Sequence, residues 1–325
     1  YMARLKVLVT GANGFVGRAV LDALAQAGHD PVAAVRGPEA AASLAHANLP
    51  VHEVGSVDGN TEWVPVLQDV DAVIHLAARV HVMQDTAASP LDAFRLVNRE
   101  GTLNLARQAF ASGVTRLVYA STIKVHGEAT PDAPFSESSP LAGKDPYAVS
   151  KIEAEQGLFT LAQDAGREAV VLRPPLVYGP GVSANFLRML KLVDKGLPLP
   201  LGLVRNKRSL IGLANLAHAL VHCVDHPQAA NRAYVVSDGQ DLSTPELIRA
   251  LASAMGKPAR LLPFPPVLLR LAGKLLGKSH VISRLLGSLA VDSSTIRAEL
   301  GWSPPQSLEQ GLRLTCDHYK ANPDN

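Results

Sequence analysis

The chain of 325 residues contains only two cysteines, Cys223 and Cys316, which lie far apart in the sequence. This scarcity excludes a disulfide framework and a cysteine-rich metal site, and it is typical of a reducing compartment. Long apolar runs are also missing, since none approaches the roughly 18 residues that a membrane span needs. The first apolar run begins at Leu5, which leaves no room for a signal peptide. We therefore expect a cytoplasmic protein without stable membrane insertion.

Charge of either sign is scarce as well. Charged residues make up 18% of the chain and the formal net charge is +2, so nothing in the balance indicates a nucleic-acid partner. Hydrophobic residues make up 47%, which excludes disorder. A chain of this length suffices for one large α/β domain and a smaller lobe, with a sizeable core.

A glycine-rich turn at residues 10–17 follows the first apolar run and precedes a helical pattern that starts at Arg18. Its G-x-x-G-x-x-G spacing between a strand and a helix is typical of a dinucleotide-binding turn. Glycines let the backbone approach a pyrophosphate, and the helix N-terminus offers free N–H groups with a partial positive charge. The turn therefore predicts a dinucleotide site, with an ordinary strand–turn–helix as the alternative.

Apolar runs alternate with helical patterns through the first half of the chain. Strands are predicted at residues 5–9, 31–35, 51–54, 72–76, 117–120 and 169–172, and helices at 18–27, 90–112 and 150–164. Continuous apolar strands that are each followed by a helix indicate a parallel sheet covered on both faces. We expect a Rossmann-type doubly wound parallel sheet.

After Arg173 the sequence becomes richer in proline and glycine. We expect residues 1–173 to form an NAD(P)-binding domain and residues 174–325 a smaller α/β substrate lobe. A return segment at 208–226 makes the boundary discontinuous.

Tyr147 and Lys151 are spaced i and i+4, which places both side chains on one face of a helix. A phenol with a pKa of about 10 exchanges protons poorly at neutral pH, and a neighbouring ammonium stabilises the phenolate. We therefore expect Lys151, together with a positively charged oxidised nicotinamide, to lower the pKa of Tyr147. The hydroxyls of Ser121 and Thr122 follow a predicted strand end, where side chains face the ligand cleft of a parallel sheet.

The glycine turn, the hydroxyl, Tyr-x-x-x-Lys and the segment 172–181 occur in an order that resembles the extended short-chain dehydrogenase/reductase family, specifically its sugar-nucleotide epimerase/dehydratase branch. The resemblance implies a catalytic triad of Thr122, Tyr147 and Lys151, with Ser121 as the weaker candidate for the hydroxyl. It implies that Tyr147 exchanges a proton with a sugar hydroxyl or ketone, and that Lys151 holds the nicotinamide ribose.

The same resemblance implies the binding residues, a UDP-sugar substrate, no metal, and a homodimer formed through helices 90–112 and 150–164. The expected cofactor contacts are Gly11, Asn13, Gly14, Phe15, Val16, Gly17, Arg36, Val57, Leu76, Ala77, Ala78, Asn98, Ala120, Tyr147, Lys151, Pro174 and Val177. The expected substrate contacts are Arg79, Lys124, His126, Asn185, Arg208, Arg284 and Asp292. A guanidinium matches phosphate oxygens, which suits Arg208 to the nucleotide diphosphate.

The second predicted strand ends in Val35 and Arg36, where NAD-dependent epimerases carry an Asp for the ribose hydroxyls. An arginine at this place can pair with the 2′-phosphate of NADP, in a charge-assisted bond of roughly 1.5–3 kcal/mol. We therefore expect NADP (NADPH) to be preferred, with NAD and a merely solvated Arg36 as the alternatives.

Further departures concern the substrate side. Leu176 replaces an Asn and His126 replaces a Tyr of the epimerases, while residues 123–125 and 78–83 are more similar to 4-reductases of UDP-4-keto-6-deoxy-N-acetylhexosamines in bacterial O-antigen biosynthesis. Our first hypothesis is NAD(P)H-dependent reduction at C4 of such a sugar. The alternatives are an NAD-dependent UDP-hexose 4-epimerase (UDP-glucose or UDP-N-acetylglucosamine) and a nucleotide-sensing protein without catalysis. A dehydratase is disfavoured because Ile123 and Lys124 replace its usual Asp-Glu pair.

Two other features remain. Residues 263–289 combine leucines with basic residues, which fits a membrane-surface helix or a helix packed on the core; we favour the packed helix. His222 and His226 have the spacing of helical metal ligands but lack an evident third ligand, so we expect helix-surface histidines.

Overall fold

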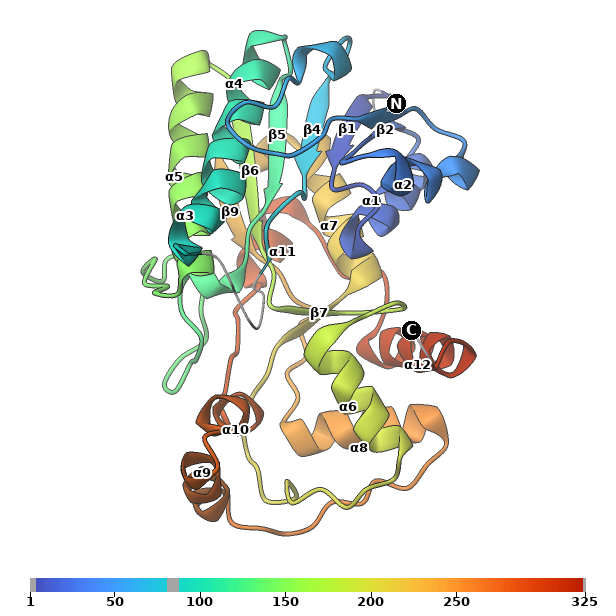
Figure 1. Ribbon diagram of the computed structural model, residues 1–325, viewed down its shortest axis with the longest axis vertical. Helices are drawn as coiled ribbons and strands as arrows, with labels where there is room; N and C mark the ends of the chain where they lie inside the picture. The colour runs from blue at the N-terminus through green and yellow to red at the C-terminus, as the bar shows by residue number, and fades with distance from the viewer. Residues whose placement is uncertain (1–3, 81–87, 324–325) are drawn as a thin grey trace.

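The computed structural model describes residues 4–80 and 88–323 and shows two lobes, one above the other in Figure 1. Within these residues the larger lobe holds a parallel sheet of seven strands in the order β3-β2-β1-β4-β5-β6-β9. The strands are β1 (Lys6–Thr10), β2 (Asp30–Val35), β3 (Val51–Glu53), β4 (Ala72–His75), β5 (Arg116–Ala120), β6 (Glu168–Arg173) and β9 (Arg232–Val235). This sheet confirms the predicted Rossmann-type architecture.

The strands read as continuous apolar runs because both faces of the sheet are buried. In β1, Val7 and Val9 join the core on one face with Leu220, whereas Leu8 joins the core on the other face with Leu105. Helices α1 (Phe15–Gln26) and α7 (Leu213–Asp225) cover the first face.

The second face is covered by two long helical segments. One is α3 (Pro90–Phe94), the π-helical η3 (Arg95–Gly101) and α4 (Thr102–Ala111) in succession, and the other is α5 (Pro146–Ala165). Helix α5 begins earlier than the predicted 150–164, since the side chain of Asp145 accepts a hydrogen bond from the Ala148 N–H at 3.0 Å and caps the helix. This cap places Tyr147 in the first turn.

The smaller lobe is built from segments far apart in the sequence. Strands β7 (Leu176–Tyr178) and β8 (Leu210–Gly212) form a parallel pair. Helices α6 (Ala184–Asp194), α8 (Thr244–Met255) and α12 (Leu308–Ala321) enclose a separate core.

The chain crosses between the lobes more often than the sequence indicates. The expected return segment contains β8, which pairs in the smaller lobe, and α7, which packs against α1. Strand β9 and helix α11 (Ser294–Leu300) also join the larger lobe, β9 as the edge strand next to β6. Neither was predicted, because β9 is four residues long and its partner is distant in sequence.

Helices α9 (Pro266–Leu275) and α10 (Ser279–Leu286) pack against each other at the end of the smaller lobe (Figure 1). Only Leu269 and Gly273 are buried in α9. Leu269 and Leu286 join the core of the smaller lobe, as expected of a packed helix, whereas Val267, Leu271 and Leu275 remain exposed. Among the described residues, no helix has both the length and the apolar character to cross a membrane.

Candidate active site

The glycine turn leaves a bare backbone between β1 and α1. Gly11 has φ +63°, and a Cβ there would lie 2.9 Å from the Ala77 nitrogen, while a Cβ on Gly17 would lie 2.2 Å from the Gly11 oxygen. Gly14 precedes α1 as its N-cap residue and provides no side-chain cap. The first hydrogen bond of the helix runs from the Arg18 N–H to the Gly14 oxygen, at 3.1 Å. The N–H groups of the first turn, including those of Phe15, Val16 and Gly17, have no partner within the helix and suit an anion.

A cavity of about 560 Å³ opens beside this turn, a size typical of cofactor sites. Its lining includes the expected contacts Gly11, Asn13, Gly14, Arg36, Val57, Leu76, Ala77 and Ala78. A helix N-terminus, a bare glycine backbone and a cavity of this size fit a dinucleotide. Of the residues predicted to bind the cofactor, these eight line one and the same cavity.

At the β2 end of the cavity, the structure adds residues that the sequence did not indicate. Arg18, Glu39 and Ser43 line it together with Arg36. The Arg18 guanidinium donates to the Asn13 oxygen at 3.0 Å and to the Ser43 oxygen at 3.3 Å. Arg36 is exposed, so this end carries two guanidinium groups next to solvent.

A buried hydrogen-bond chain supports the cavity wall at Leu76 and Ala77. The Thr10 hydroxyl accepts from the N–H groups of these two residues at 3.0 and 3.1 Å. Its own proton therefore goes to His75 Nδ1, 2.6 Å away. His75 Nε2 then donates to Thr102 at 2.9 Å. Burial, with help from the Lys151 charge, lowers the pKa of His75 to about 3, so the ring is neutral and its tautomer is set.

Tyr147 lies at the other end of the site, with its ring edge-on to Phe94 at 5.9 Å. Burial and, to a smaller extent, the charge of Asp145 raise the pKa of Tyr147 to about 12, against the opposing effect of a hydrogen bond from Thr122. The predicted lowering of this pKa is therefore absent in the protein alone, because loss of water dominates. Of the two candidate hydroxyls, Thr122 contacts Tyr147, whereas Ser121 Oγ is buried without a hydrogen-bond partner among the described residues.

The Lys151 ammonium is held by β5. Its Nζ donates to the Ala120 oxygen at 2.8 Å and lies 4.2 Å from the centroid of the Tyr119 ring. Burial lowers the pKa of Lys151 to about 7, against the opposing charge of Glu155. Tyr147 and Lys151 are thus both shifted toward their neutral forms.

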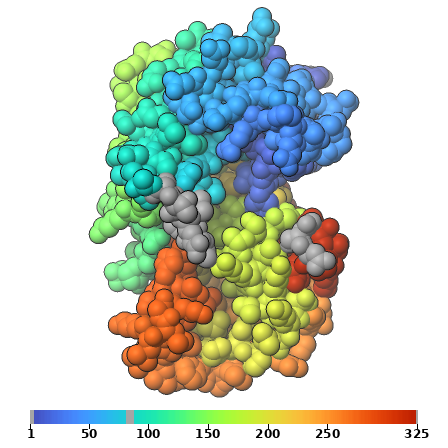
Figure 2. Space-filling view, viewed as in Figure 1, coloured from blue at the N-terminus to red at the C-terminus, as the bar shows by residue number. Residues whose placement is uncertain are grey.

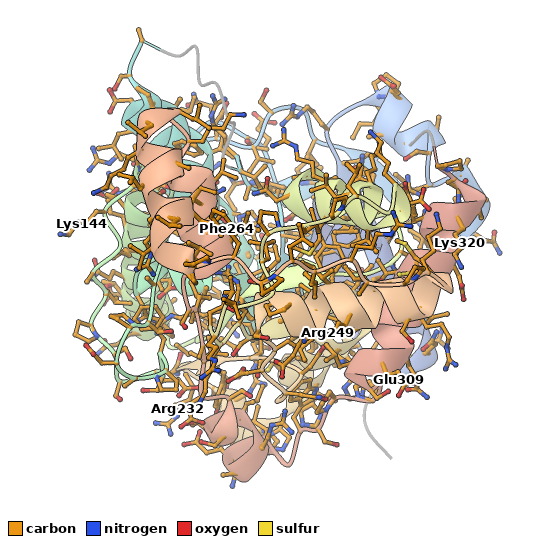
Figure 3. The ribbon with its side chains drawn as sticks, turned by 90° about the horizontal axis from the view of Figure 1, so that it is seen from below. Lys144, Arg232, Arg249, Phe264, Glu309 and Lys320 are labelled. Carbon is orange, nitrogen blue, oxygen red and sulfur yellow. The ribbon has the colours of Figure 1, made fainter. Side chains whose placement is uncertain are left out.

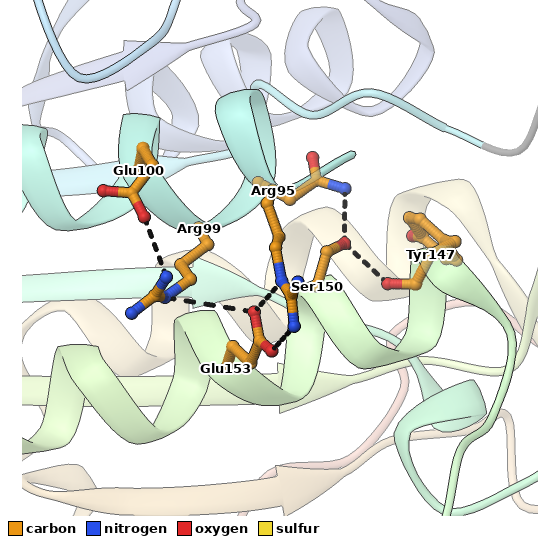
Figure 4. A network of polar contacts seen from close by, with 7 residues as sticks. Arg95, Arg99, Glu100, Tyr147, Ser150 and Glu153 are labelled. Atoms are coloured by element: carbon orange, nitrogen blue, oxygen red, sulfur yellow. Dashed lines mark hydrogen bonds and ion pairs between the residues drawn. The ribbon is translucent and has the colours of Figure 1, made fainter. Parts of the chain in front are cut away.

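A polar network holds α5 against the preceding helix (Figure 4). Asn98 Nδ2 donates to Ser150 Oγ at 3.0 Å, and Ser150 donates to the Tyr147 oxygen at 2.7 Å. Asn98 also bonds both the N–H and the oxygen of Arg79, at 2.8 and 3.0 Å. The buried amide of Asn98 thereby positions the first turn of α5, a role that its expected cofactor contact did not include.

The same figure shows an ion pair between Arg95 and Glu153 that joins η3 to α5. Arg79 places its guanidinium 5.5 Å from the Phe94 ring centroid. Residues 81–83, part of the segment that resembles the reductases, lie outside the described residues.

Two of the expected substrate residues, Lys124 and His126, differ in their access to the site. Lys124 Nζ is 6.0 Å from the centroid of the Tyr147 ring and 3.7 Å from the Glu128 carboxylate. His126 is buried, with Nδ1 3.1 Å from the Pro140 oxygen and Nε2 3.2 Å from the Arg173 guanidinium. Both ring nitrogens of His126 are occupied, so this geometry argues against a substrate contact for His126.

The remaining expected contacts lie on the smaller lobe. Arg208 donates to the Arg284 oxygen at 3.0 Å, and burial together with the Arg284 charge lowers the pKa of Arg208. Asn185 is exposed near the start of α6. Asp292 is exposed as well and accepts from the Ser294 N–H at 2.9 Å.

Pro174 and Val177 follow the carboxyl end of β6, the strand that pairs with β5. The Pro174 oxygen accepts from the Ile123 N–H at 3.0 Å, which ties this segment to the triad loop, and Val177 lies in β7. The rings of His218 and His222 stack along α7 with centroids 6.2 Å apart, and the ring of His226, just after the helix, is tilted against His222 at 5.1 Å. No group of three or more potential metal ligands occurs within residues 4–80 and 88–323.

Comparison with known proteins agrees with this geometry. The NAD dependent epimerase/dehydratase family matches residues 7–237. A UDP-glucose 4-epimerase of Vibrio cholerae is 44% identical over 316 residues, which cover 96% of this chain and 95% of that protein. An N-acetyl-alpha-D-glucosaminyl-diphospho-ditrans,octacis-undecaprenol 4-epimerase of Escherichia coli O157:H7 is 24% identical, over 96% of this chain and 94% of that one.

Among solved structures, DesIV of Streptomyces venezuelae, a dTDP-glucose 4,6-dehydratase with NAD and TYD bound, has a TM-score of 0.77 at 25% identity, with 98% of each chain covered. The UDP-glucuronic acid 4-epimerase of Bacillus cereus in complex with NAD has a TM-score of 0.78 at 22% identity, covering 98% and 99% of the two chains. The chain belongs to the NAD dependent epimerase/dehydratase family. It is thus an NAD(P)-dependent enzyme of the extended short-chain dehydrogenase/reductase type.

Proposed function

We propose that the protein is an NAD-dependent 4-epimerase of a UDP-hexose, with UDP-glucose and UDP-N-acetylglucosamine as the candidate substrates. The observation that carries the proposal is the contact between Thr122 and Tyr147, in a chain that also has a cavity of dinucleotide size and is 44% identical over nearly its whole length to a UDP-glucose 4-epimerase. This relationship supports epimerisation over the 4-reduction that the sequence alone favoured.

Bound nicotinamide supplies the hydride acceptor and donor at C4. Tyr147 removes the proton of the C4 hydroxyl when the sugar is oxidised and returns it when the ketone is reduced, while Thr122 holds the phenol oxygen. Lowering the Tyr147 pKa from about 12 to neutrality requires about 7 kcal/mol of phenolate stabilisation. One charged hydrogen bond supplies only about 1.5–3 kcal/mol, so Lys151 and Lys124 together do not suffice, and we propose that the positive charge of the oxidised nicotinamide supplies the remainder.

For the sugar nucleotide, we propose that Arg208 and Arg284 hold the diphosphate. Burial and the Arg284 charge lower the pKa of Arg208, and a dianion between the two guanidinium groups would oppose this lowering. Asn185 and Asp292 then face the uridine side, and Arg79 faces the sugar. A homodimer through the helices α4 and α5 remains part of the proposal.

A 4-keto-sugar reductase is the second candidate, and two observations favour it. Tyr147 rests as a neutral phenol, which is the form that donates a proton to a ketone. Arg18 and Arg36 flank the β2 end of the cavity, where a 2′-phosphate of NADPH would lie. We propose that this pair allows NADP to bind as well as NAD.

Product analysis of the purified protein tests the proposal. UDP-glucose and UDP-N-acetylglucosamine are incubated separately with NAD, and the products are separated by anion exchange and identified by proton NMR. We expect the C4 epimer to form without net consumption of nucleotide. Stoichiometric oxidation of NADPH by a UDP-4-keto-6-deoxy sugar, without epimer formation, would establish the reductase instead. Cofactor binding without either reaction would indicate a nucleotide-sensing protein.

A further inference from the structure

The pair of helices α9 and α10, with the segment that leads into them, forms a surface that we call the basic hairpin (residues 260–286). Its two helices pack on each other through Gly273, where an added Cβ would lie 2.8 Å from Ile282. The hairpin forms the end of the smaller lobe away from the parallel sheet (Figures 1 and 2). Figure 3, seen from below, shows Phe264 at the start of α9.

The outer face of the basic hairpin is apolar. Val267, Leu271 and Leu275 follow one side of α9 at helical spacing and are 72%, 54% and 79% exposed. Leu276, in the turn after the helix, is 71% exposed. A soluble protein rarely leaves several large aliphatic side chains together in water, and such a patch marks an interaction site.

The charge of the hairpin has one sign only. No Asp or Glu occurs between Glu246 and Asp292, while the hairpin contains five basic residues, Arg260, Arg270, Lys274, Lys278 and Arg284. The whole chain has a net charge of +2, so the residues outside the hairpin sum to −3. Among the described residues, no ion pair involves a lysine or arginine of the hairpin.

The apolar row and the basic residues lie next to each other on α9. On a helical projection, Arg270 and Lys274 border one side of the row formed by Val267, Leu271 and Leu275. Leu268 borders the other side of this row. Aliphatic side chains on one face, flanked by basic residues and without acids, are the pattern of a helix that lies in a lipid–water interface. A protein partner would need a matching acidic rim, whereas an anionic bilayer provides both negative charge and an apolar layer.

We propose that the basic hairpin docks the protein peripherally on an anionic phospholipid bilayer. The apolar row enters the headgroup boundary, and Arg270, Lys274 and Lys278 pair with lipid phosphates. Helix α10 also carries Arg284, whose oxygen accepts from Arg208, so the docked hairpin connects directly to the residues proposed to hold the diphosphate. The inference does not depend on which sugar is the substrate.

Sedimentation with lipid vesicles tests the proposal. Vesicles of equal parts phosphatidylglycerol and phosphatidylethanolamine are compared with vesicles of phosphatidylcholine alone. We expect the full chain to sediment with the anionic vesicles and to be released by salt. Arg270→Gln with Lys274→Gln should weaken binding by roughly 25-fold, at about fivefold for each charge near the surface. Leu271→Gln with Leu275→Gln should weaken it by at least about tenfold.

The matched control is Leu192→Gln with Leu314→Gln, because these leucines are also exposed but lie on α6 and α12. The control should bind vesicles as the unchanged protein does, and thermal unfolding verifies that all variants fold. Equal binding to both kinds of vesicle, or equal loss in the control, would overturn the proposal. So would a change of oligomeric state of the Leu271/Leu275 variant in lipid-free solution, since the hairpin would then be a protein interface.

Discussion

The two ends of the candidate active site differ in how far their charged and polar groups are buried. At the end formed by β5 and α5, Tyr147, Lys151 and His75 lie in an environment whose burial shifts all three pKa values toward the neutral forms. At the end formed by β2, Arg36 is exposed, and the Arg18 guanidinium donates to the backbone oxygens of Asn13 and Ser43. Burial makes electrostatic interactions strong and costly, whereas water and salt screen them. Changes at the buried end should therefore have large effects on catalysis and stability, and changes at the exposed end should have small effects that depend on salt.

The largest expected effect is that of Tyr147→Phe. The substitution removes the proton carrier and leaves the ring that packs on Phe94, so turnover should fall about 10²–10⁴-fold while cofactor affinity stays unchanged. Steady-state rates and a fluorescence titration with NAD measure the two quantities. Tyr319→Phe on α12 is the matched control and should keep full activity. Turnover of Tyr147→Phe within a few-fold of the unchanged protein would remove Tyr147 from the reaction.

The next largest effect is expected for Lys151→Met, which should raise the free energy of unfolding although it lowers activity. Burial lowers the Lys151 pKa from 10.5 to about 7, so between these values the unfolded chain binds more protons, and the free energy of unfolding rises with pH by up to about 1.4 kcal/mol per unit. At pH 7 the buried amine therefore costs up to about 5 kcal/mol. Lys151→Met should stabilise the cofactor-free protein by about 3 kcal/mol at that pH, after loss of the hydrogen bond to Ala120.

Urea unfolding between pH 7 and pH 10 measures this gain, which should shrink as the pH rises. Lys195→Met, at an exposed lysine, is the control and should show no such trend. The same Lys151→Met protein should lose turnover, as expected when an active-site group is kept at the expense of stability. A variant that is less stable than the unchanged protein at pH 7 would show that Lys151 is not buried at a cost.

The comparison also shows which parts of the molecule the sequence could predict. Local patterns were sufficient for the glycine turn, for six strands of the sheet and for the i, i+4 pair of Tyr147 and Lys151, because each depends on residues close in the chain. Strand β9 was missed because its place is decided by pairing with β6. The neighbours of a buried group are likewise invisible in a linear pattern, so the rise of the Tyr147 pKa in the protein without cofactor was not predicted.

His126 and the basic hairpin illustrate the same limit. The position of His126 beside the triad strand favoured a substrate contact, but Arg173, held by Glu155 from α5, occupies one ring nitrogen. The pattern of α9 was interpreted as a helix packed on the core, and Leu269 does pack there, but Val267, Leu271 and Leu275 face solvent. Periodicity indicates that a helix has two faces, and only the packing of the lobe decides which face is covered.

The smallest expected effect is at the exposed end and sharpens the comparison by separating the two cofactors. If Arg36 pairs with a 2′-phosphate, Arg36→Ala should weaken NADPH binding roughly ten- to hundredfold, because one charge-assisted bond is lost. NADH binding should barely change, since a bare ribose offers this side chain no anionic partner. The preference of the unchanged protein for NADPH should also decline at high salt, because an exposed contact is screened. Titrations of both cofactors against both proteins, at low and high salt, measure these differences. An equal effect on NADH and NADPH would identify Arg36 as a solvated surface residue and would leave NAD as the cofactor of a 4-epimerase.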